Sequence, residues 1–458
     1  MNLPLISRKQ RWNFAALLFL TAAFALAGWK LLGRLPAPAF APVLQQVAPR
    51  SDSSVSSFNA SQQPHYLSPD GHLRLDAQFV SSVPGRAVHA ASIVELLDGR
   101  LRAVWFSGSK EGAGDVSIQS AVTDIASSQW MAETTLFERQ KIQQGLWRFV
   151  KKLGNPVIAR APDGSLCIWM VTVSLGGWAG SSITWARSTD EGLNWSQPRR
   201  LVTSPFLNIS TLVKGSPVAL QGGQIMLPVY HEFIAKFGEI LRIDSRGQVV
   251  DKIRIPGSHT SLQPVLLVAT PERAQVYMRS GNAAALMTSS THDAGRNWTP
   301  VRPTLWPNPD SALAGLVTPA AGQWLALNPE PHGRSSLALL QTATGGDFDG
   351  VRPRFVESSA ATQSRISTRE FDRLLGNELK AQGVRDEQIQ RYVASARRQL
   401  CAADCAQEFS YPFLLQTRDG YIHLIYTWHR TRIKHVRFHP LQPFSVVRTG
   451  QANATVLH

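Results

Sequence analysis

The chain has 458 residues, of which 43% are hydrophobic and 17% are charged. This length and this balance exclude a mini-protein, a globally disordered chain and a polytopic membrane protein. Lys and Arg outnumber Asp and Glu by 47 to 32, and the net charge of +15 attracts nucleic acid, anionic lipid or acidic glycans. Thirteen Trp, 33 Gly and 28 Pro, with few long helical patterns, predict an all-β protein of short strands and turns.

The N-terminal segment predicts export. A basic cluster at residues 8–11 precedes an apolar run over residues 12–32, which is about the length needed to span a bilayer. We favour a transmembrane helix that anchors the chain in the inner membrane, with the rest in the periplasm. The Ala-Leu-Ala at residues 25–27 also fits a cleavage site, so secretion after removal of a signal peptide is the alternative. In either case nucleic acid is not expected as a partner.

Composition divides the chain into four parts. Residues 1–35 hold the basic start and the membrane or signal segment, and residues 36–72 are rich in Pro, Ala, Ser and Gln, as in a flexible linker. The folded domain is expected over residues 73–440, and residues 441–458 form a C-terminal tail.

Two eight-residue segments are nearly superimposable. Residues 188–195 and 291–298 both read S/T-x-D-x-G-x-x-W, and each follows a predicted strand. In such a turn the Asp carboxylate accepts from backbone N–H groups, the Gly takes a positive φ, and the Trp fills the space between neighbouring sheets. The repeat therefore predicts two equivalent hairpin turns.

A looser repeat runs through the same region. Six stretches share a strand that in most cases begins near a Pro and runs into a turn; they start at His89, Asn155, Ser216, Gln263, Ala312 and Tyr411. Six similar innermost strands predict a six-bladed β-propeller. The last interval is too long by about one blade, and residues 364–404 carry helical patterns, so a helical insertion is expected near blades five and six.

The eight-residue repeats resemble the Asp boxes of the sialidase, or bacterial neuraminidase repeat, family. The chain is similar to this superfamily over nearly all of residues 73–440. Sialidases use three arginines for the substrate carboxylate, a Tyr nucleophile paired with a Glu, and an Asp acid. The resemblance implies that Arg279 and Arg334 bind a carboxylate and that Tyr411 is the nucleophile.

Two positions depart from this pattern. Gln263 stands where the family has the Glu, and an amide cannot accept the proton of a nucleophilic Tyr. His89, with only Arg86 nearby, stands where the family has its first arginine. The chain is most similar to the divergent branch of predicted neuraminidases. His89 is a candidate base or acid in a substituted mechanism, because the ordinary pKa of His lies near operating pH; a buried structural His is the alternative.

The general acid is expected in the Gly-rich loop over residues 108–115, the region that supplies the sialidase Asp. Glu111 and Asp115 are the candidates, since a desolvated carboxyl can stay protonated and donate to a leaving oxygen. A solvated turn is the alternative for this loop.

Further residues are candidates for substrate binding. Asn155, Lys214 and Gln263 lie at starts of inner strands and would donate to hydroxyl or carboxylate groups. Trp428 and Arg430 begin a basic, aromatic stretch that suits a platform for sugar stacking, with a plain basic hairpin as the alternative. No metal-binding pattern and no phosphate-binding loop are found, so neither a metal nor a cofactor is expected.

The three cysteines exclude a disulfide scaffold. Cys401 and Cys405, four residues apart near the end of a helical segment, could form a disulfide or remain two thiols.

Two functional classes remain. The leading hypothesis is an exported, membrane-anchored exoglycosidase of sialidase type that acts on an acidic glycan of the cell envelope or its surroundings. The alternatives are a non-hydrolytic propeller that binds or helps assemble polysaccharide, and a polysaccharide lyase on the same scaffold.

Overall fold

The computed structural model describes residues 8–32, 38–41, 73–74, 76–204, 208–358, 365–441 and 444–445. It divides into two units, Met1–Pro38 and Ala39–His458. The first contains a single described helix, α1 (Arg8–Leu32). Among the helices in these ranges, none combines the length and the apolar character that a membrane span needs. The transmembrane helix predicted over residues 12–32 therefore finds no support in the structure.

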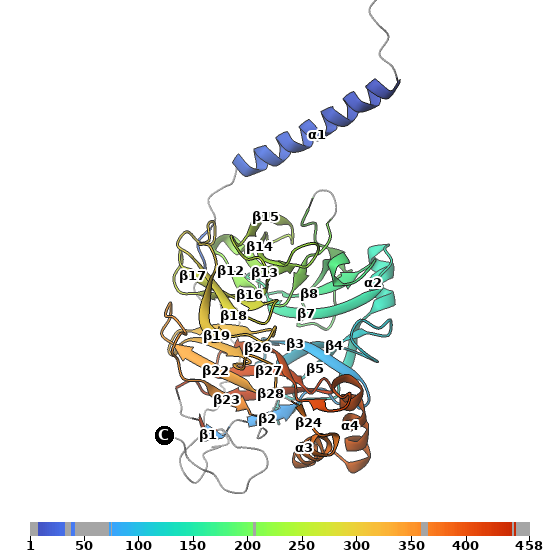
Figure 1. Ribbon diagram of the computed structural model, residues 1–458, viewed down its shortest axis with the longest axis vertical. Helices are drawn as coiled ribbons and strands as arrows, with labels where there is room; N and C mark the ends of the chain where they lie inside the picture. Colours follow the sequence, from blue (N-terminus) through green and yellow to red (C-terminus); the bar gives the residue numbers. More distant parts are fainter. Residues whose placement is uncertain are drawn as a thin grey trace, which may run out of the picture. The chain divides into compact units, whose positions relative to one another are not determined.

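The second unit is a β-propeller of six antiparallel sheets arranged around one axis (Figure 1). In the first five blades the strands follow chain order from the innermost to the outermost. Blade 1 comprises β3 (Ala87–Glu95), β4 (Leu101–Gly108), β5 (Ser117–Val122) and β6 (Thr134–Glu138). Blade 2 comprises β7 (Lys152–Arg160), β8 (Leu166–Val173), β9 (Ser181–Ser188) and β10 (Arg199–Arg200). Blade 3 comprises β11 (Leu212–Val213), β12 (Val218–Ala219), β13 (Ile225–His231), β14 (Phe237–Ile243) and β15 (Val249–Arg254). The six predicted blades are confirmed.

The remaining three blades are built alike. Blade 4 comprises β16 (Ser261–Val268), β17 (Ala274–Ser280), β18 (Ala285–Thr291) and β19 (Arg302–Pro307). Blade 5 comprises β20 (Ala314–Thr318), β21 (Gly322–Leu327), β22 (Leu337–Thr342) and β23 (Arg354–Glu357). Blade 6 comprises β26 (Phe409–Gln416), β27 (Ile422–Trp428), β28 (Arg432–Phe438) and, as its outermost strand, β2 (Asp76–Phe79).

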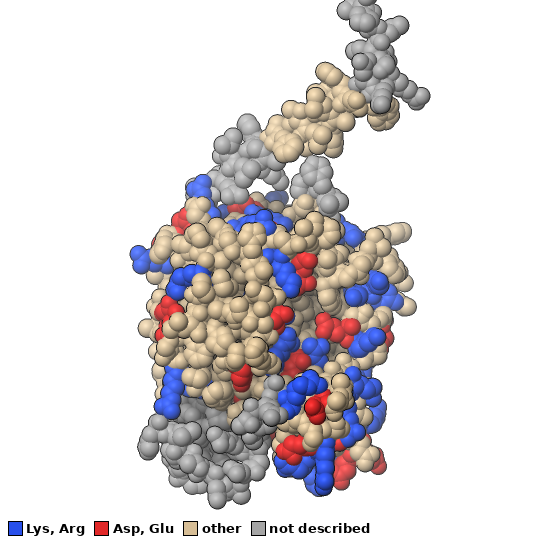
Figure 2. Space-filling model, viewed as in Figure 1, with Lys and Arg blue, Asp and Glu red and all other residues tan. Residues whose placement is uncertain are grey.

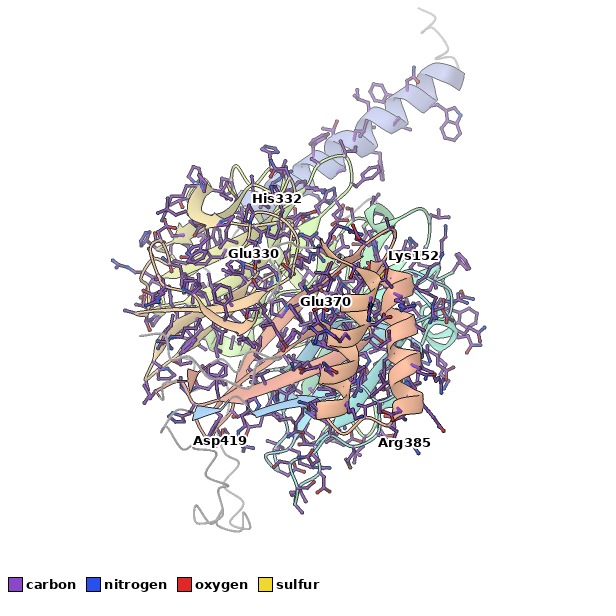
Figure 3. All side chains as sticks on the ribbon, turned by 60° about the horizontal axis from the view of Figure 1, so that its bottom comes forward. Lys152, Glu330, His332, Glu370, Arg385 and Asp419 are labelled. Atoms are coloured by element: carbon purple, nitrogen blue, oxygen red, sulfur yellow. A yellow bond between two sulfur atoms is a disulfide. The ribbon has the colours of Figure 1, made fainter. Side chains whose placement is uncertain are left out.

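Strand β2 closes the ring, because it comes from the start of the domain and pairs with β28 at its end. A further short parallel pair joins β1 (Leu73–Arg74) to β29 (Phe444–Ser445). Closure of this kind leaves the sheet without a long open edge between the first and last blades. The blades contact one another in chain order around the ring, so blades 2 and 5 lie opposite each other; Figure 3 labels Lys152 of blade 2 and Glu330 of the loop between β21 and β22.

Four inner strands contain a β-bulge at their start. The register shifts lie in β3, β7, β16 and β26, and each includes a residue with a left-handed φ: Ala90 (54°), Asn155 (42°), Gln263 (50°) and Tyr411 (54°). The last three precede a Pro, which has no N–H to give to the ladder and is tolerated at bulges. Bulges change the direction of side chains and are common next to functional sites. We therefore call the end of the propeller that carries these four bulges the site end.

Both Asp boxes form the predicted turn. In the first, Asp190 Oδ1 accepts from Ser188 Oγ (2.7 Å) and from the backbone N of Asn194 (2.9 Å), while Trp195 Nε1 donates to the Gly192 carbonyl (3.1 Å). The second copy repeats these bonds within residues 291–298. Ser188 is in register with the last residues of β7 rather than its start. The Asp boxes therefore lie at the end opposite the site end.

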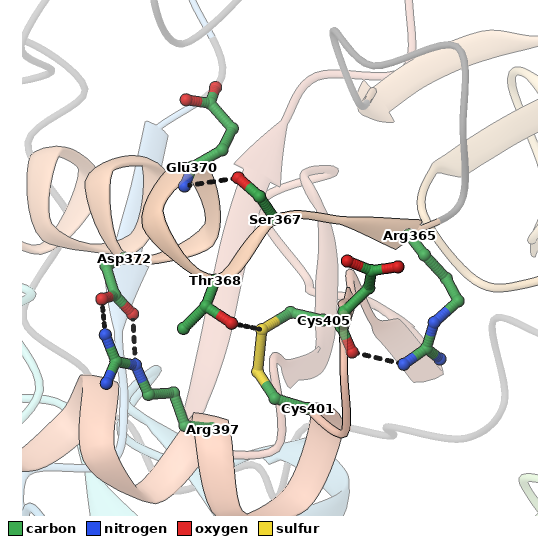
Figure 4. The surroundings of a disulfide bond; sticks show 9 residues. Arg365, Ser367, Thr368, Glu370, Asp372, Arg397, Cys401 and Cys405 are labelled. Carbon is green, nitrogen blue, oxygen red and sulfur yellow. Dashed lines mark hydrogen bonds and ion pairs between the residues drawn. A yellow bond between two sulfur atoms is a disulfide. The ribbon is translucent and has the colours of Figure 1, made fainter.

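The helical insertion lies between blades 5 and 6, as predicted. It contains β24 (Arg365–Ile366), α3 (Thr368–Ala381), α4 (Asp386–Leu400) and β25 (Cys405–Ala406). Ser367 caps α3 by accepting from the backbone N of Glu370, and a disulfide joins Cys401 to Cys405 (Figure 4). The buried faces of both helices share a core with blades 5 and 6, so their amphipathic pattern is explained by packing on the propeller. A further helix, α2 (Arg139–Leu146), connects blades 1 and 2.

Part of the predicted linker packs on the propeller. The backbone N of Phe40 donates to the Pro271 carbonyl (2.8 Å), that of Ala41 donates to the Ala219 carbonyl (3.0 Å), and the Phe40 side chain is fully buried. Burying a Phe side chain stabilises by roughly 1.5–3 kcal/mol. These residues therefore belong to the folded unit.

Candidate active site

A chain of hydrogen-bonded side chains joins four blades at the site end. Gln263 Nε2 of blade 4 donates to the phenol oxygen of Tyr411 in blade 6 (3.2 Å) and to that of Tyr230 in blade 3 (3.4 Å). Asn155 Nδ2 of blade 2 also donates to the Tyr230 oxygen (3.2 Å). Gln263 and Asn155 are site residues that the sequence predicts, whereas Tyr230 is not among them. The three bulges at Asn155, Gln263 and Tyr411 aim these side chains at one another.

Arg279 fixes the orientation of the Gln263 amide. Its Nη1 donates to Gln263 Oε1 (3.1 Å) and to the Tyr411 oxygen (3.4 Å). Because a guanidinium only donates, the amide oxygen must face Arg279 and the amide NH₂ must face the tyrosines. Gln263 therefore cannot take the proton of Tyr411 through its oxygen.

A chain of alternating charges continues from Arg279 around the site. Arg279 Nε donates to Asp310 Oδ1 (2.7 Å), and Arg334 Nη2 donates to the Asp310 carbonyl (2.8 Å). Arg334 Nη1 and Arg430 Nε donate to the two carboxylate oxygens of Glu408 (3.3 and 2.9 Å). Three guanidinium groups thus lie in one connected network beside Tyr411.

Glu408 is the buried centre of this network. Burial alone would raise its pKa, but Arg430 and Arg334 outweigh that effect and lower the pKa to about 2. Glu408 is therefore an anion that holds two arginines in place. Its position three residues before Tyr411, immediately before strand β26, is the sequence signal that could have identified it.

Arg430 occupies the corner next to blade 1. It lies in the turn between β27 and β28, where His429 (φ 47°) and Arg430 (φ 53°) are both left-handed, as a tight hairpin requires. The Arg430 carbonyl accepts from the backbone N of Val88 (3.0 Å), the residue before His89. Blade 6 therefore supplies a guanidinium beside the position where blade 1 has His89.

His89 packs directly on Tyr411. The ring centroids are 4.2 Å apart, and Phe106 forms a T-shaped contact with the imidazole at 5.7 Å. Burial, and then the charge of Arg430, place the pKa of His89 well below its usual value, so the ring is neutral. Its Nδ1 has no partner among the described residues. A catalytic role for His89 stays a prediction.

Two predicted binding residues lie outside this hydrogen-bonded network. Lys214 is buried and donates to the Pro412 carbonyl (2.8 Å), behind Tyr411, and burial lowers its pKa to about 7. Trp428 is 2% exposed and packs edge-on against Phe79, with 5.2 Å between ring centroids. Because its rings are covered by the core, Trp428 cannot serve as an exposed platform for a sugar.

The two candidate acids differ in their surroundings. Asp115 accepts from the backbone N and the Oγ of Ser109 (2.9 and 3.0 Å), which closes the loop as a turn. Glu111 Oε2 accepts from Arg430 Nη1 (3.2 Å) and so extends the chain of charges. Of the pair, Glu111 is the one that touches a site residue.

A third carboxyl was missed in the sequence. Glu232 follows Tyr230 by two residues, and its partly buried carboxyl interacts electrostatically with Arg279 and Asp310. Burial raises its pKa, the direction that suits a proton donor. The Tyr-His-Glu sequence at the end of β13 carries no recognisable motif.

Two other observations bound the chemistry. In the described ranges, no group of three or more His, Cys, Asp or Glu side chains is placed to hold a metal ion. A small cavity lined by Asp163, Trp169 and Trp185, among others, lies at the Asp-box end and therefore away from this network.

Solved structures resemble this fold at low sequence identity. A Hadza microbial sialidase, Hz136, matches with a TM-score of 0.56 and 14% identity over 77% of this chain, which spans 66% of that protein. NanB sialidase from Streptococcus pneumoniae matches at 0.55 and 9% identity (79% and 70% covered), and an intramolecular trans-sialidase from Ruminococcus gnavus at 0.52 and 12% (80% and 97%).

Identities this low establish a shared propeller fold and no more. No curated protein sequence matches the chain. The model of the BNR repeat-like domain matches residues 99–424, which is most of the propeller, and the chain therefore belongs to the BNR repeat-like domain family.

Proposed function

We propose that the chain is an exoglycosidase of sialidase type that acts on an acidic glycan. The observation that carries this proposal is the network of Arg279, Arg334 and Arg430 beside Tyr411. Sialidases use three arginines for a carboxylate, and in this chain the third comes from blade 6 rather than from blade 1.

The network suits a sugar carboxylate. Asp310, Glu408 and Glu111 fix the guanidinium groups, and each guanidinium has five N–H donors, more than these bonds use. Charge-assisted bonds from such pre-positioned donors hold an anionic sugar in one pose. Basic and acidic side chains are interspersed over the face seen in Figure 2, and the net charge of +15 favours the approach of acidic glycans.

The proposed chemistry uses Tyr411 as the nucleophile. Gln263 and Arg279 both donate to its oxygen and would stabilise negative charge there, although neither can act as a base. A glycosidase also needs a proton donor on the other side of the scissile bond, and the candidates are Glu111, which bonds Arg430, and Glu232, which interacts with Arg279. His89 is neutral and packs on the Tyr411 ring, so it is the candidate base that would take the phenol proton of Tyr411.

One observation favours a second candidate, a non-hydrolytic glycan-binding propeller. The amide NH₂ of Gln263 faces Tyr411, so the usual carboxylate partner of the nucleophile is missing. Such a site would still bind an acidic sugar through its arginines.

Export remains part of the proposal. The Cys401–Cys405 disulfide supports an oxidising compartment, such as the periplasm or the exterior, because disulfides seldom persist in the cytosol. Anchoring through residues 12–32 is a separate hypothesis that membrane fractionation of the full chain would test.

Binding of sialosides and uronic-acid glycans to site variants tests the proposal. Arg279→Ala and Arg334→Ala should each weaken binding by about 1.5–3 kcal/mol, the range for hydrogen bonds to charged groups. Arg296→Ala, in the second Asp box, is the matched control and should bind normally. Unchanged binding in both site variants would end the carboxylate hypothesis.

Turnover separates the two candidates. Activity that survives His89→Ala but is lost in Tyr411→Phe would support the sialidase mechanism, whereas activity lost in His89→Ala with binding intact would support a substituted one. Binding without turnover of any acidic glycan would favour the non-hydrolytic propeller.

A further inference from the structure

Loops at the site end of blades 1 to 3 expose large apolar side chains. Trp147 and Phe149, between α2 and β7, are 97% and 57% exposed, and Leu175, between β8 and β9, is 79% exposed. Ile234, between β13 and β14, is 95% exposed. The strands that these loops connect include β7 and β13, which carry Asn155 and Tyr230 of the site.

The loop that bears Trp147 is held firmly. Ile142 and Val150 on either side of it are buried, and Arg148 Nε donates to Ser174 Oγ (2.5 Å), which joins this loop to the one that bears Leu175. Trp147 itself has a left-handed φ of 50° at the C-terminus of α2. Its exposure is therefore a consequence of the folded backbone.

Ile234 is exposed in spite of a conformational cost. The backbone N of Ala235 donates to the Phe233 carbonyl (2.7 Å) and closes a three-residue turn around Ile234, whose φ is 65°. A β-branched residue in the left-handed region is strained, and this type of turn is rare. Because Ile234 is 95% exposed, packing within the described part of the chain does not offset this strain, whereas a partner outside the chain would.

Basic residues alternate with these apolar ones. Arg148, Lys151 and Lys152 follow Trp147 within five residues, and Lys236 follows Ile234. Lys151 is exposed, and Lys236 is partly exposed, with a long bond to the Gly281 carbonyl (3.4 Å) and an electrostatic interaction with Glu232. Aromatic and aliphatic side chains interleaved with lysines are typical of surfaces that enter the headgroup region of an anionic bilayer.

We propose that the site end of blades 1 to 3 docks on an anionic lipid surface through Trp147, Phe149, Leu175 and Ile234. A soluble sugar chain is a poorer match, because Leu175 and Ile234 have no ring to stack on a sugar. Docking would bring the arginine network against the headgroups. The acidic glycan would then be one carried by a lipid, a step that rests on the function proposed above.

Fluorescence quenching of the full chain tests the docking. Brominated phosphatidylcholine quenches Trp that enters the bilayer, and the contribution of Trp147 is the difference between the wild type and Trp147→Phe. This difference should be quenched on vesicles that contain phosphatidylglycerol and much less on vesicles of phosphatidylcholine alone. The absence of quenching on anionic vesicles overturns the proposal, and because α1 is common to both proteins it cannot produce the difference.

Vesicle affinity provides a second measurement. Ile234→Ser should bind anionic vesicles several-fold more weakly than Leu193→Ser, a control that alters an 80% exposed Leu at the Asp-box end. Lys151→Gln should lose about fivefold, the equivalent of about 1 kcal/mol per basic residue at an anionic surface. Equal vesicle affinities of all three variants would contradict docking. Self-association of the wild type that Trp147→Phe abolishes, measured by sedimentation velocity, would also contradict it, because a second copy would then cover Trp147.

The substrate step has its own readout. Trp147→Ser should lower turnover of a lipid-carried acidic glycan and leave turnover of a water-soluble one unchanged. If no acidic glycan is turned over at all, the proposed function fails, while the quenching experiment still decides the docking. Equal loss on both substrates would overturn the inference that the glycan is lipid-carried.

Discussion

Lys214 reaches from blade 3 to blade 6 and donates from its Nζ to the carbonyl oxygen of Pro412, at 2.8 Å. Pro412 follows Tyr411, whose φ of 54° is left-handed and costs on the order of 1–3 kcal/mol. Lys214 Nζ also lies 5.8 Å from the centre of the Tyr411 ring. Lys214 therefore acts as a positioning residue: it holds the backbone next to Tyr411 and so fixes the direction of the Tyr411 side chain.

If the chain is a glycosidase, Lys214→Met should lower kcat by about tenfold or more with little change in KM, because misplacing a reacting group mainly affects the chemical step. Lys214→Arg, which keeps a donor at this position, should recover part of the rate. Steady-state kinetics on an acidic glycoside measures both variants. Equal losses in Met and Arg variants, matched by equal losses of stability, would indicate a purely structural role.

The buried Lys214 also predicts a pH dependence of stability. Burial lowers its pKa from 10.5 to about 7. Between these two pH values the unfolded chain binds a proton that the folded chain does not, so the free energy of unfolding rises as pH increases from 7 towards 10. Below pH 7 Lys214 is charged in both the folded and the unfolded chain, so its contribution to the free energy of unfolding no longer changes with pH. Denaturant unfolding should show a shallower rise in Lys214→Met, and an unchanged slope would contradict this assignment.

Glu408→Gln should destabilise the chain by roughly 3–5 kcal/mol, because Arg334 and Arg430 would lose the anion that they share. The pKa of Glu408 is lowered to about 2, so its stabilising effect is complete above about pH 4.5 and is lost as pH falls through 2. Urea unfolding should therefore show the largest difference from the wild type above pH 5 and a shrinking one below it. A difference that does not depend on pH would argue against an ionised Glu408.

Much of the fold could be predicted from the sequence. The Asp boxes at residues 188–195 and 291–298 are local motifs whose Asp, Gly and Trp are fixed by one turn geometry, and both form as expected. The spacing of inner-strand starts predicted six blades for the same reason, since each blade repeats a local pattern. The sequence did not decide whether Cys401 and Cys405 form a disulfide, because the bond depends on the positions of β24 and β25.

The site was predicted only in part. Arg279, Arg334, Gln263 and Tyr411 were identified because they fall in recognisable stretches of the chain. Tyr230 was missed, since its role depends on contacts with Asn155 and Gln263, which are far apart in the sequence. Glu408 was missed although it lies three residues before Tyr411. Trp428 was assigned to the surface because an aromatic residue beside arginines has the same sequence pattern in a platform and in a core, and only burial distinguishes the two.

The Asp boxes should contribute to stability and not to binding. Asp293 accepts from Thr291 Oγ1 and from the backbone N of Asn297 (both 2.8 Å) at the Asp-box end. Asp293→Ala should lower the free energy of unfolding by about 1–2 kcal/mol through the loss of these bonds. Affinity for acidic glycans should stay at the wild-type value, as calorimetry would show. Weaker glycan binding would mean that the Asp-box end contacts the ligand.

The last prediction concerns a buried chain of hydrogen bonds between blades 6 and 1. Trp130 Nε1 lies 3.2 Å from Nδ1 of His435, and Nε2 of His435 lies 2.8 Å from Nδ1 of His423. Because an indole N–H only donates, Nδ1 of His435 must accept, so its Nε2 carries the proton and donates to His423. His423 then donates from Nε2 to Thr417 Oγ1 (3.1 Å). This order of donors requires both imidazoles to be neutral.

Acid should therefore destabilise the propeller through these two histidines. Burial lowers the pKa of His423 to about 3 and places that of His435 well below 6.5, whereas both are protonated near pH 6.5 in the unfolded chain. As pH falls below 6.5 the unfolded chain binds protons that the folded chain excludes, so each histidine lowers the free energy of unfolding by about 1.4 kcal/mol per pH unit. His435→Gln keeps a donor and an acceptor but does not titrate. Its unfolding free energy should fall less steeply between pH 6 and pH 4 than that of the wild type, while the exposed control His259→Gln keeps the wild-type slope. Equal slopes in all three proteins would show that the histidine pair is protonated in the folded state.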